Sequence, residues 1–178
     1  LRPLGLRLLC LDEGLLLKDA LFIYLLFSHQ VIMSYENICG GIVMSKSHLQ
    51  SIYDVIGAET IEEIVHAFYP KVYADPDLIP IFDVVEMKEI MRKQTLFLTQ
   101  FTGGPPLFSQ EFGPPMMRQR HFPHDITPTR ARAWLRCMKA AFQEIGLWDQ
   151  PVGQLFYSRL QQVASIMINT EEDEQNQL

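Results

Sequence analysis

A short stretch at residues 117–123, with the sequence MRQRHFP, combines residue types that could bind a metal ion and an anion side by side. Pro123 prevents a helix from continuing, so His121 lies at the end of a short, firmly bounded segment. A neutral imidazole in such a position is a good metal ligand, and the guanidinium groups of Arg118 and Arg120 suit carboxylates. A haem needs both partners, because it carries iron at its centre and propionates at its edge. The same pattern also fits a capped loop with a solvated histidine, so the rest of the chain must decide.

The length and composition describe one globular domain. The chain has 178 residues, of which 48% are hydrophobic and 20% are charged, which is enough for one full core but too little for two ordinary domains. The net charge of −6 argues against a nucleic-acid-binding protein, and part of it comes from an acidic tail at residues 171–178. The three cysteines, Cys10, Cys39 and Cys137, are widely spaced and form no CxxC motif. This usage fits a reducing compartment, so we expect a cytoplasmic protein.

The first 43 residues differ from the rest of the chain and permit three interpretations. The apolar run at residues 20–27 is shorter than the roughly 20 residues that span a bilayer. A signal peptide could use Arg2 and Arg7, but acidic residues interrupt it and no small-residue cleavage site follows. We favour the third interpretation, translated upstream sequence, because Met44 begins an ordinary-looking start. Residues 1–43 are therefore expected to be a non-native or disordered apolar leader.

From residue 44 to residue 170 the hydrophobic pattern predicts an all-α domain. A short helix ends at Gly57, and the next begins with a capping box formed by Thr60 and Glu63. Pro70 falls inside the apolar stripe of this second helix and is expected to kink it beside Tyr69. The remaining helices are predicted from Asp83 to Gly103, from Thr127 to Gly146 and from Asp149 to Met167, with a Pro/Gly-rich loop at residues 103–115.

The helix that follows Asp83 carries one polar residue on its apolar face. That face consists of Met87, Ile90, Met91, Gln94, Phe97, Leu98 and Phe101. An unpaired amide buried there would cost a few kcal/mol, so Gln94 needs a partner. Spacing alone leaves open whether that partner is neighbouring backbone or a bound ligand. Spacing alone also favours ordinary core positions for Tyr69 and Trp134.

Several motifs, in this order and spacing, resemble the group II truncated haemoglobins. They are Phe68-Tyr69, Arg92-Lys93-Gln94, Phe97-Leu-Thr-Gln-Phe101 followed by Gly103-Gly104-Pro105, Arg118-Gln-Arg-His121, and Ala133-Trp134-Leu-Arg-Cys-Met138. The match covers nearly everything after Met44. The resemblance implies a globin-like two-over-two helical sandwich, at residues 44–170, around haem b.

The resemblance also implies a role for individual residues. His121 corresponds to the proximal ligand of the haem iron. Tyr69, Gln94 and Trp134 correspond to the distal residues that stabilise a bound ligand. The other residues implied to contact the cofactor are Phe82, Ile90, Lys93, Phe97, Phe108 and Arg120. Among these, Lys93 and Arg120 match positions whose charges meet propionates, and Phe82 takes the aromatic place that wedges the haem.

Three residues depart from the family pattern. Phe108 stands where relatives have a tyrosine, so one polar haem contact is missing. Ile90 occupies the distal gate and cannot hydrogen-bond the ligand. Pro70, directly after Tyr69, departs from the usual helix at the residue that aims the tyrosine hydroxyl.

The other histidines offer no comparable site. His66 lies on the polar side of its helix and is expected to face solvent. His124 forms a His-x-x-His pair with His121, but Pro123 lies between them and no cysteine or carboxylate pair completes a zinc site.

The implied distal donors predict tight binding and slow release of oxygen, which favours chemistry over oxygen carriage. The expected ligands are O2, NO or peroxide, with an unidentified reductase as partner and no nucleic acid or membrane. Whether the chain is an enzyme stays open, with weak peroxidase or NO-detoxifying activity as candidates, and it is expected to be a monomer or homodimer. The alternative from another class is a haem-free globin-like sensor or interaction domain, tethered to a membrane by the leader.

Overall fold

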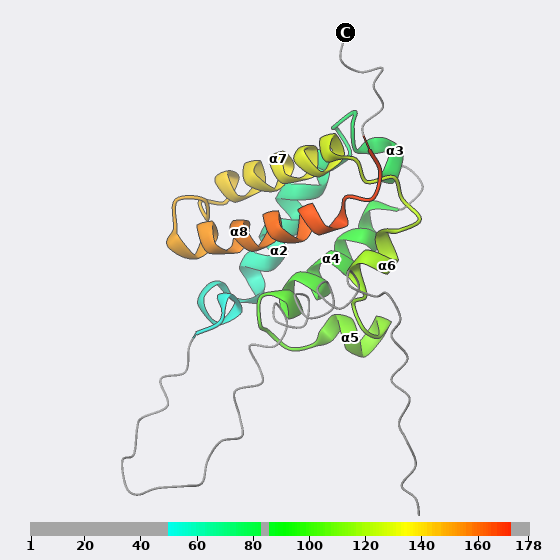
Figure 1. The fold of residues 1–178 in the computed structure, drawn as a ribbon. Helices are drawn as coiled ribbons and strands as arrows, with labels where there is room; N and C mark the ends of the chain where they lie inside the picture. Colours follow the sequence, from blue (N-terminus) through cyan, green and yellow to red (C-terminus); the bar gives the residue numbers. More distant parts are fainter. Residues whose placement is uncertain (1–49, 83–85, 172–178) are drawn as a thin grey trace, which may run out of the picture. The chain divides into compact units, whose positions relative to one another are not determined.

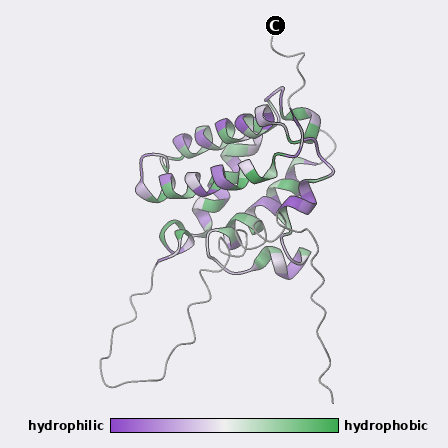
Figure 2. Cartoon of the chain, viewed as in Figure 1, coloured by the Kyte–Doolittle hydropathy of each residue, from purple (hydrophilic) through white to green (hydrophobic). Residues whose placement is uncertain are grey.

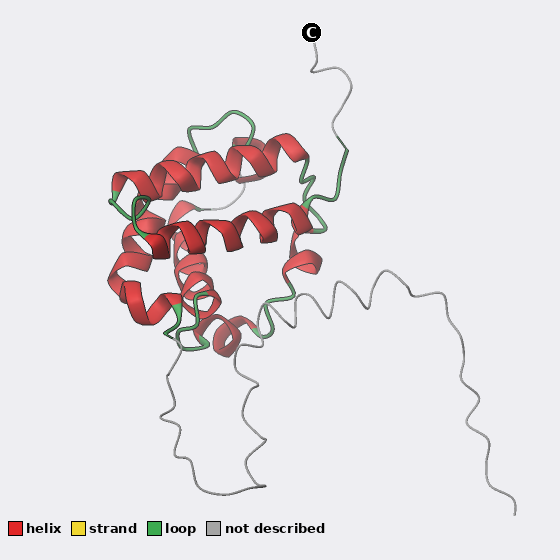
Figure 3. Cartoon of the chain, turned by 60° about the vertical axis from the view of Figure 1, so that its left-hand side comes forward, coloured by secondary structure: helices red, strands yellow, loops and turns green. Residues whose placement is uncertain are grey.

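The computed structural model describes residues 50–82 and 86–171. The leader, the predicted N-cap Asp83 and residues 172–178 of the acidic tail lie outside the described residues, so the predictions for them stay predictions. Within the described ranges every regular element is a helix (Figures 1 and 3), which confirms the all-α fold class.

The described residues form seven helices arranged as two packed pairs. They are α2 (Ile52–Val72), α3 (Ile79–Phe82), α4 (Met87–Phe101), α5 (Leu107–Phe112), α6 (Met117–His121), α7 (Pro128–Glu144) and α8 (Pro151–Met167). Helix α2 packs against both α4 and α7, and α7 packs against α8. In Figure 1, α7 and α8 run side by side across α2. This is the predicted two-over-two arrangement.

Helix α2 begins with a capping box, but not at the predicted residues. The Ser51 hydroxyl accepts from the Asp54 N–H, and the Asp54 carboxylate accepts from the Ser51 N–H. The capping box predicted at Thr60 was wrong, because Thr60 lies inside the helical run. The one break in α2 is at Gly57, whose φ of 75° and ψ of 175° suit a residue without a side chain.

Pro70 is accommodated in the last turn of α2, and the only residue of this helix with non-helical backbone dihedrals is Gly57. The Lys71 ammonium donates to the Ala67 carbonyl oxygen at 2.8 Å and pairs with the Glu144 carboxylate of α7. The Tyr73 N–H donates to the Tyr69 carbonyl oxygen at 3.0 Å, so the helical bonding continues past the proline. Tyr69 is consequently fixed on the buried face of α2.

The segment predicted as a loop at residues 103–115 contains helix α5. The Gln100 amide bridges to Ser109, donating to its hydroxyl at 2.7 Å and accepting from its N–H at 2.9 Å. This contact between α4 and α5 is tertiary, and local propensity carries no signal for it. It helps to hold Phe108 in a buried position against α4.

The close approach between the end of α4 and the start of α2 depends on glycine. A Cβ atom on Gly104 would lie 2.7 Å from the Tyr53 ring and 2.8 Å from the Thr99 carbonyl oxygen.

Helix α7 is capped as predicted. The Thr127 hydroxyl accepts from the Arg130 N–H at the start of this helix. Figure 2 shows hydrophobic and hydrophilic residues on the same helices, the pattern expected for helices that bury one face.

None of the helices in the described ranges is both long enough and apolar enough to cross a bilayer.

Candidate functional site

A cavity of about 420 Å³ lies between the helices. This volume falls within the range of small-molecule and cofactor sites, roughly 300–1,000 Å³. Its wall includes all ten residues singled out from the sequence, which are Tyr69, Phe82, Ile90, Lys93, Gln94, Phe97, Phe108, Arg120, His121 and Trp134. These residues come from six helices, α2 to α7, so the fold brings together residues that are distant in sequence.

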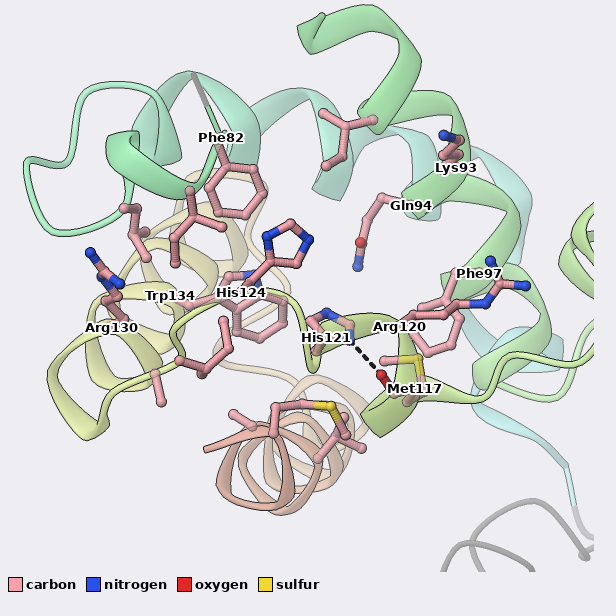
Figure 4. A pocket seen from close by; sticks show the side chains of 18 of the residues that line it. Phe82, Lys93, Gln94, Phe97, Met117, Arg120, His121, His124, Arg130 and Trp134 are labelled. Carbon is pink, nitrogen blue, oxygen red and sulfur yellow. Dashed lines mark hydrogen bonds between the residues drawn. The ribbon is translucent and has the colours of Figure 1, made fainter. Parts of the chain in front are cut away.

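His121 presents one ring nitrogen to the cavity at the end of α6. Its Nδ1 lies 2.7 Å from the Met117 carbonyl oxygen (Figure 4), and because a carbonyl only accepts, Nδ1 carries the proton. The lone pair is therefore on Nε2, which makes no bond to that carbonyl. Burial lowers the pKa of His121, and the nearby His124 lowers it further against the opposing effect of the Met117 bond. A neutral, oriented imidazole of this kind is ready to bind a metal ion.

Tyr69 and Gln94 meet on the cavity wall. The Tyr69 hydroxyl lies 3.4 Å from Gln94 Oε1, longer than the roughly 2.5–3.0 Å of a strong O–H···O bond. Burial raises the pKa of Tyr69, with a smaller contribution from Tyr73, so the phenol stays protonated and can donate. The partner of Gln94 is thus a side chain, and Figure 4 shows its amide reaching into the cavity from α4.

Trp134 supplies a second donor from α7. Its ring packs edge-on against Phe68 of α2 with 5.2 Å between centroids, which fixes the indole plane. No acceptor for the indole N–H is found among the described residues. Tyr69 also packs edge-on against Phe68, at 5.1 Å, so one phenyl ring orients both donors.

Positive charges surround the cavity. Lys93 pairs with Glu89 at 2.7 Å, and Arg120 donates to the Phe112 carbonyl oxygen at 2.6 Å. Arg130 donates to the carbonyl oxygen of Asp125 at 2.6 Å. The described lining residues include these three cations and no aspartate or glutamate. The wall is therefore suited to an anionic group.

The remaining walls are apolar. Phe97 and Phe108 pack edge-on at 5.7 Å, and Phe82 packs against Tyr69 at 6.3 Å. Ile90 offers no hydrogen-bonding group to the cavity. Phe108, expected in a loop, lies in α5 and still faces the cavity. Flat aromatic and aliphatic side chains of this kind can contact the faces of a macrocycle.

Sequence reasoning missed part of the wall. His124 and Arg130 line the cavity, and Figure 4 shows the His124 ring pointing into it. Helix α8 contributes Leu160, Val163, Ala164 and Met167. The apolar stripe of α8 was visible in the sequence, but helical periodicity does not distinguish a core face from a cavity wall. No comparable signal marked Arg130.

Two other expectations about histidine concern residues that the structure describes. His66 is exposed on α2, as predicted. Over residues 50–82 and 86–171, no group of three histidine, cysteine or acidic side chains could hold a metal ion.

The residues present fit a haem. A neutral imidazole nitrogen on one wall suits the iron, phenol and indole donors on another suit a bound ligand, and cations suit propionates. The apolar walls between them suit the porphyrin faces. The donor set thus matches each chemical part of the group.

The comparisons with known proteins agree with this geometry. Residues 51–169 match the model of the bacterial-like globin family. The chain is 44% identical over 122 residues to group 2 truncated haemoglobin YjbI of Bacillus subtilis, covering 68% of this chain and 91% of that protein. The group II truncated haemoglobin of Bacillus anthracis aligns with a TM-score of 0.67 at 42% identity, covering 70% of this chain and 95% of that one. The truncated oxygen-avid haemoglobin of Bacillus subtilis aligns with a TM-score of 0.65 at 43% identity, covering 67% of this chain and 100% of that one. The chain therefore belongs to the bacterial-like globin family and, within it, to the group II truncated haemoglobins.

Proposed function

We propose that this protein holds haem b through His121 and binds O2 and other diatomic ligands with high affinity. The observation that carries the proposal is the meeting, in one cavity, of the His121 imidazole with the donors Tyr69 and Trp134. A haem bound here would supply an iron atom that binds diatomic gases. In that arrangement Met117 keeps the proton on Nδ1 of His121, and Nε2 is left to bind the metal.

The distal residues would slow ligand release. The Tyr69 hydroxyl makes only a long contact with Gln94, and the Trp134 N–H has no acceptor among the described residues, so both are available to a ligand. Each hydrogen bond contributes about 1 kcal/mol, which slows release about fivefold. Slow release favours chemistry on the ligand, such as NO detoxification or weak peroxidase activity, over oxygen carriage. That chemistry requires a reductase as partner.

The haem-free alternative makes a different demand on the interior. A globin-like domain without a cofactor would fill its centre with bulky apolar side chains, because interiors are close-packed. The cavity of about 420 Å³, with Gln94 on its wall, supports the haem-binding proposal instead.

The experiment is a haemin titration of the wild type, His121→Ala and the control His66→Ala. His66 is exposed on α2 and does not line the cavity, so its variant should bind as the wild type does. His121→Ala should lose or shift the Soret band and bind haemin more weakly. An unchanged Soret band and unchanged affinity in His121→Ala would refute the assignment.

A further inference from the structure

The segment that carries His121 cannot hold its own position. Helix α6 spans only five residues, Met117–His121, and helices this short are not stable alone. At its C-terminal end the His121 carbonyl oxygen has no helical N–H four residues on and accepts instead from the His124 N–H of the following turn, at 3.0 Å. The chain then turns through residues 122–126, which form no regular element, before α7 begins. The Met117 carbonyl oxygen orients the imidazole within α6, but the position of α6 itself must be set by contacts from elsewhere.

Those contacts come from Asn169, just after the end of α8. Its side-chain amide donates to the His124 carbonyl oxygen at 2.9 Å and to the His121 carbonyl oxygen at 3.2 Å. Its Oδ1 accepts from the Ile126 N–H at 2.9 Å, and its own N–H donates to the Ile126 carbonyl oxygen at 3.0 Å. Asn169 thus binds three points of the turn at residues 121–126.

The residue type matters here. Asparagine offers two donors and one acceptor on one small planar group, and this turn uses all of them. An aspartate would keep the acceptor for Ile126 but would aim a carboxylate at two carbonyl oxygens. Asn169 is exposed, so its bonds are not a by-product of core packing.

We propose that Asn169 is a positioning residue for the proximal imidazole: it ties the turn at residues 121–126 to the end of α8 and so holds the end of α6, with His121, in place. The inference rests on the proposed haem binding through His121. Helix α8 packs against α6 and also lines the cavity through Ala164 and Met167. The bonds of Asn169 therefore fix the segment that carries His121 relative to the part of the cavity wall that α8 forms.

The test compares Asn169→Asp and Asn169→Ala with the control Ser165→Ala. Ser165 is an exposed hydroxyl on α8 that donates within its own helix to the Gln162 carbonyl oxygen. In the haem-loaded full chain, resonance Raman measures the iron–histidine stretching band, and transfer to apomyoglobin measures haem release. In the haem-free chain, amide hydrogen exchange measures protection of the Ile126 N–H, and thermal melting reports folding.

Asn169→Asp loses the two bonds that the amide donates, and Asn169→Ala loses all three side-chain bonds. Both variants should shift or broaden the iron–histidine band and speed haem release by at least about fivefold, the effect of about 1 kcal/mol. Ser165→Ala should change neither. The Ile126 N–H should exchange faster in Asn169→Ala but stay protected in Asn169→Asp, which keeps the acceptor.

An Asn169→Asp protein with the wild-type band and wild-type haem release would overturn the inference, even if its melting temperature fell. If His121→Ala bound haemin as the wild type does, the proposed haem binding through His121 would itself be refuted. The Ile126 exchange data do not depend on haem, so they would still show whether Asn169 ties the turn.

Discussion

Replacement of Tyr69 by phenylalanine separates ligand binding from stability. The Tyr69 ring is 2% exposed and packs against Phe68 and Phe82, contacts that phenylalanine keeps. The change removes only the hydroxyl. Because that hydroxyl lies 3.4 Å from Gln94 Oε1, its loss breaks a weak internal bond. The free energy of unfolding should therefore fall by no more than about 1 kcal/mol.

The effect on ligand release should be readily measured even though the loss of stability is small. The raised pKa of Tyr69 keeps the phenol protonated at neutral pH, so in the wild type it is always a donor. A hydrogen bond of about 1–1.4 kcal/mol to bound oxygen slows dissociation by about five- to tenfold. Tyr69→Phe should therefore release oxygen about five- to tenfold faster, while its association rate changes little.

The assay is stopped-flow displacement of oxygen by carbon monoxide, with Tyr157→Phe as the matched control. The Tyr157 hydroxyl donates to the Leu135 carbonyl oxygen at 3.2 Å and does not line the cavity. That variant makes the same chemical change and should leave the off-rate at the wild-type value. Equal off-rates in the wild type, Tyr69→Phe and Tyr157→Phe would show that Tyr69 does not bond the ligand.

Four further outcomes are expected. Trp134→Phe should speed oxygen release about fivefold, and combining it with the tyrosine change should give less than the product of the two effects, because both donors share one acceptor; additive effects in stopped-flow would contradict this. Gly104→Ala should lower the free energy of unfolding by about 1–3 kcal/mol in urea titrations, since its Cβ would lie 2.8 Å from the Thr99 carbonyl oxygen. Burial, and secondarily a nearby carboxylate, raises the pKa of the Cys137 thiol. The contribution of this thiol to the free energy of unfolding is present below the pKa of the unfolded state and is lost as pH rises through the pKa of the folded state. Peptide mass spectrometry should find that Cys137 is alkylated slowly at pH 8 until the protein unfolds. A chain beginning at Met44 should bind haemin as the full chain does, and a loss of binding would show that the leader contributes to the fold.

The sequence predicted the fold class and the cavity residues for different reasons. Helical spacing identified the long helices because each buries one apolar face. The cavity residues came mainly from motif resemblance, since a polar Gln94 or an apolar Phe97 on a helix face does not reveal what it faces. The order and spacing of the motifs identified the cavity residues because the resemblance implies a complete fold, with the place of each residue in it.

The failures of prediction have two origins. Helix α5 depends on a tertiary contact between Gln100 and Ser109 that local propensity does not signal. The capping box at Ser51 is local, with Asp54 three residues on, and was missed because the pattern at Thr60 and Glu63 has the same form. Asn169 is the clearest case of the first origin. It lies 48 residues from His121, in a segment with no motif, and its role follows only from the hydrogen bonds that it makes.

The polar side chains on the cavity wall affect both the stability of the fold and its ability to bind a ligand. A chain of this size could gain stability by filling the space with a larger apolar side chain at Gln94 or Ile90. Instead it leaves a phenol with a long hydrogen bond, an indole on the cavity wall and a neutral imidazole among cations. Each departure weakens the isolated fold, and each is compensated when a group with iron, anionic edges and a diatomic ligand binds. Stability and ligand affinity are therefore set by the same side chains, and a substitution that fills the cavity should raise the first while lowering the second.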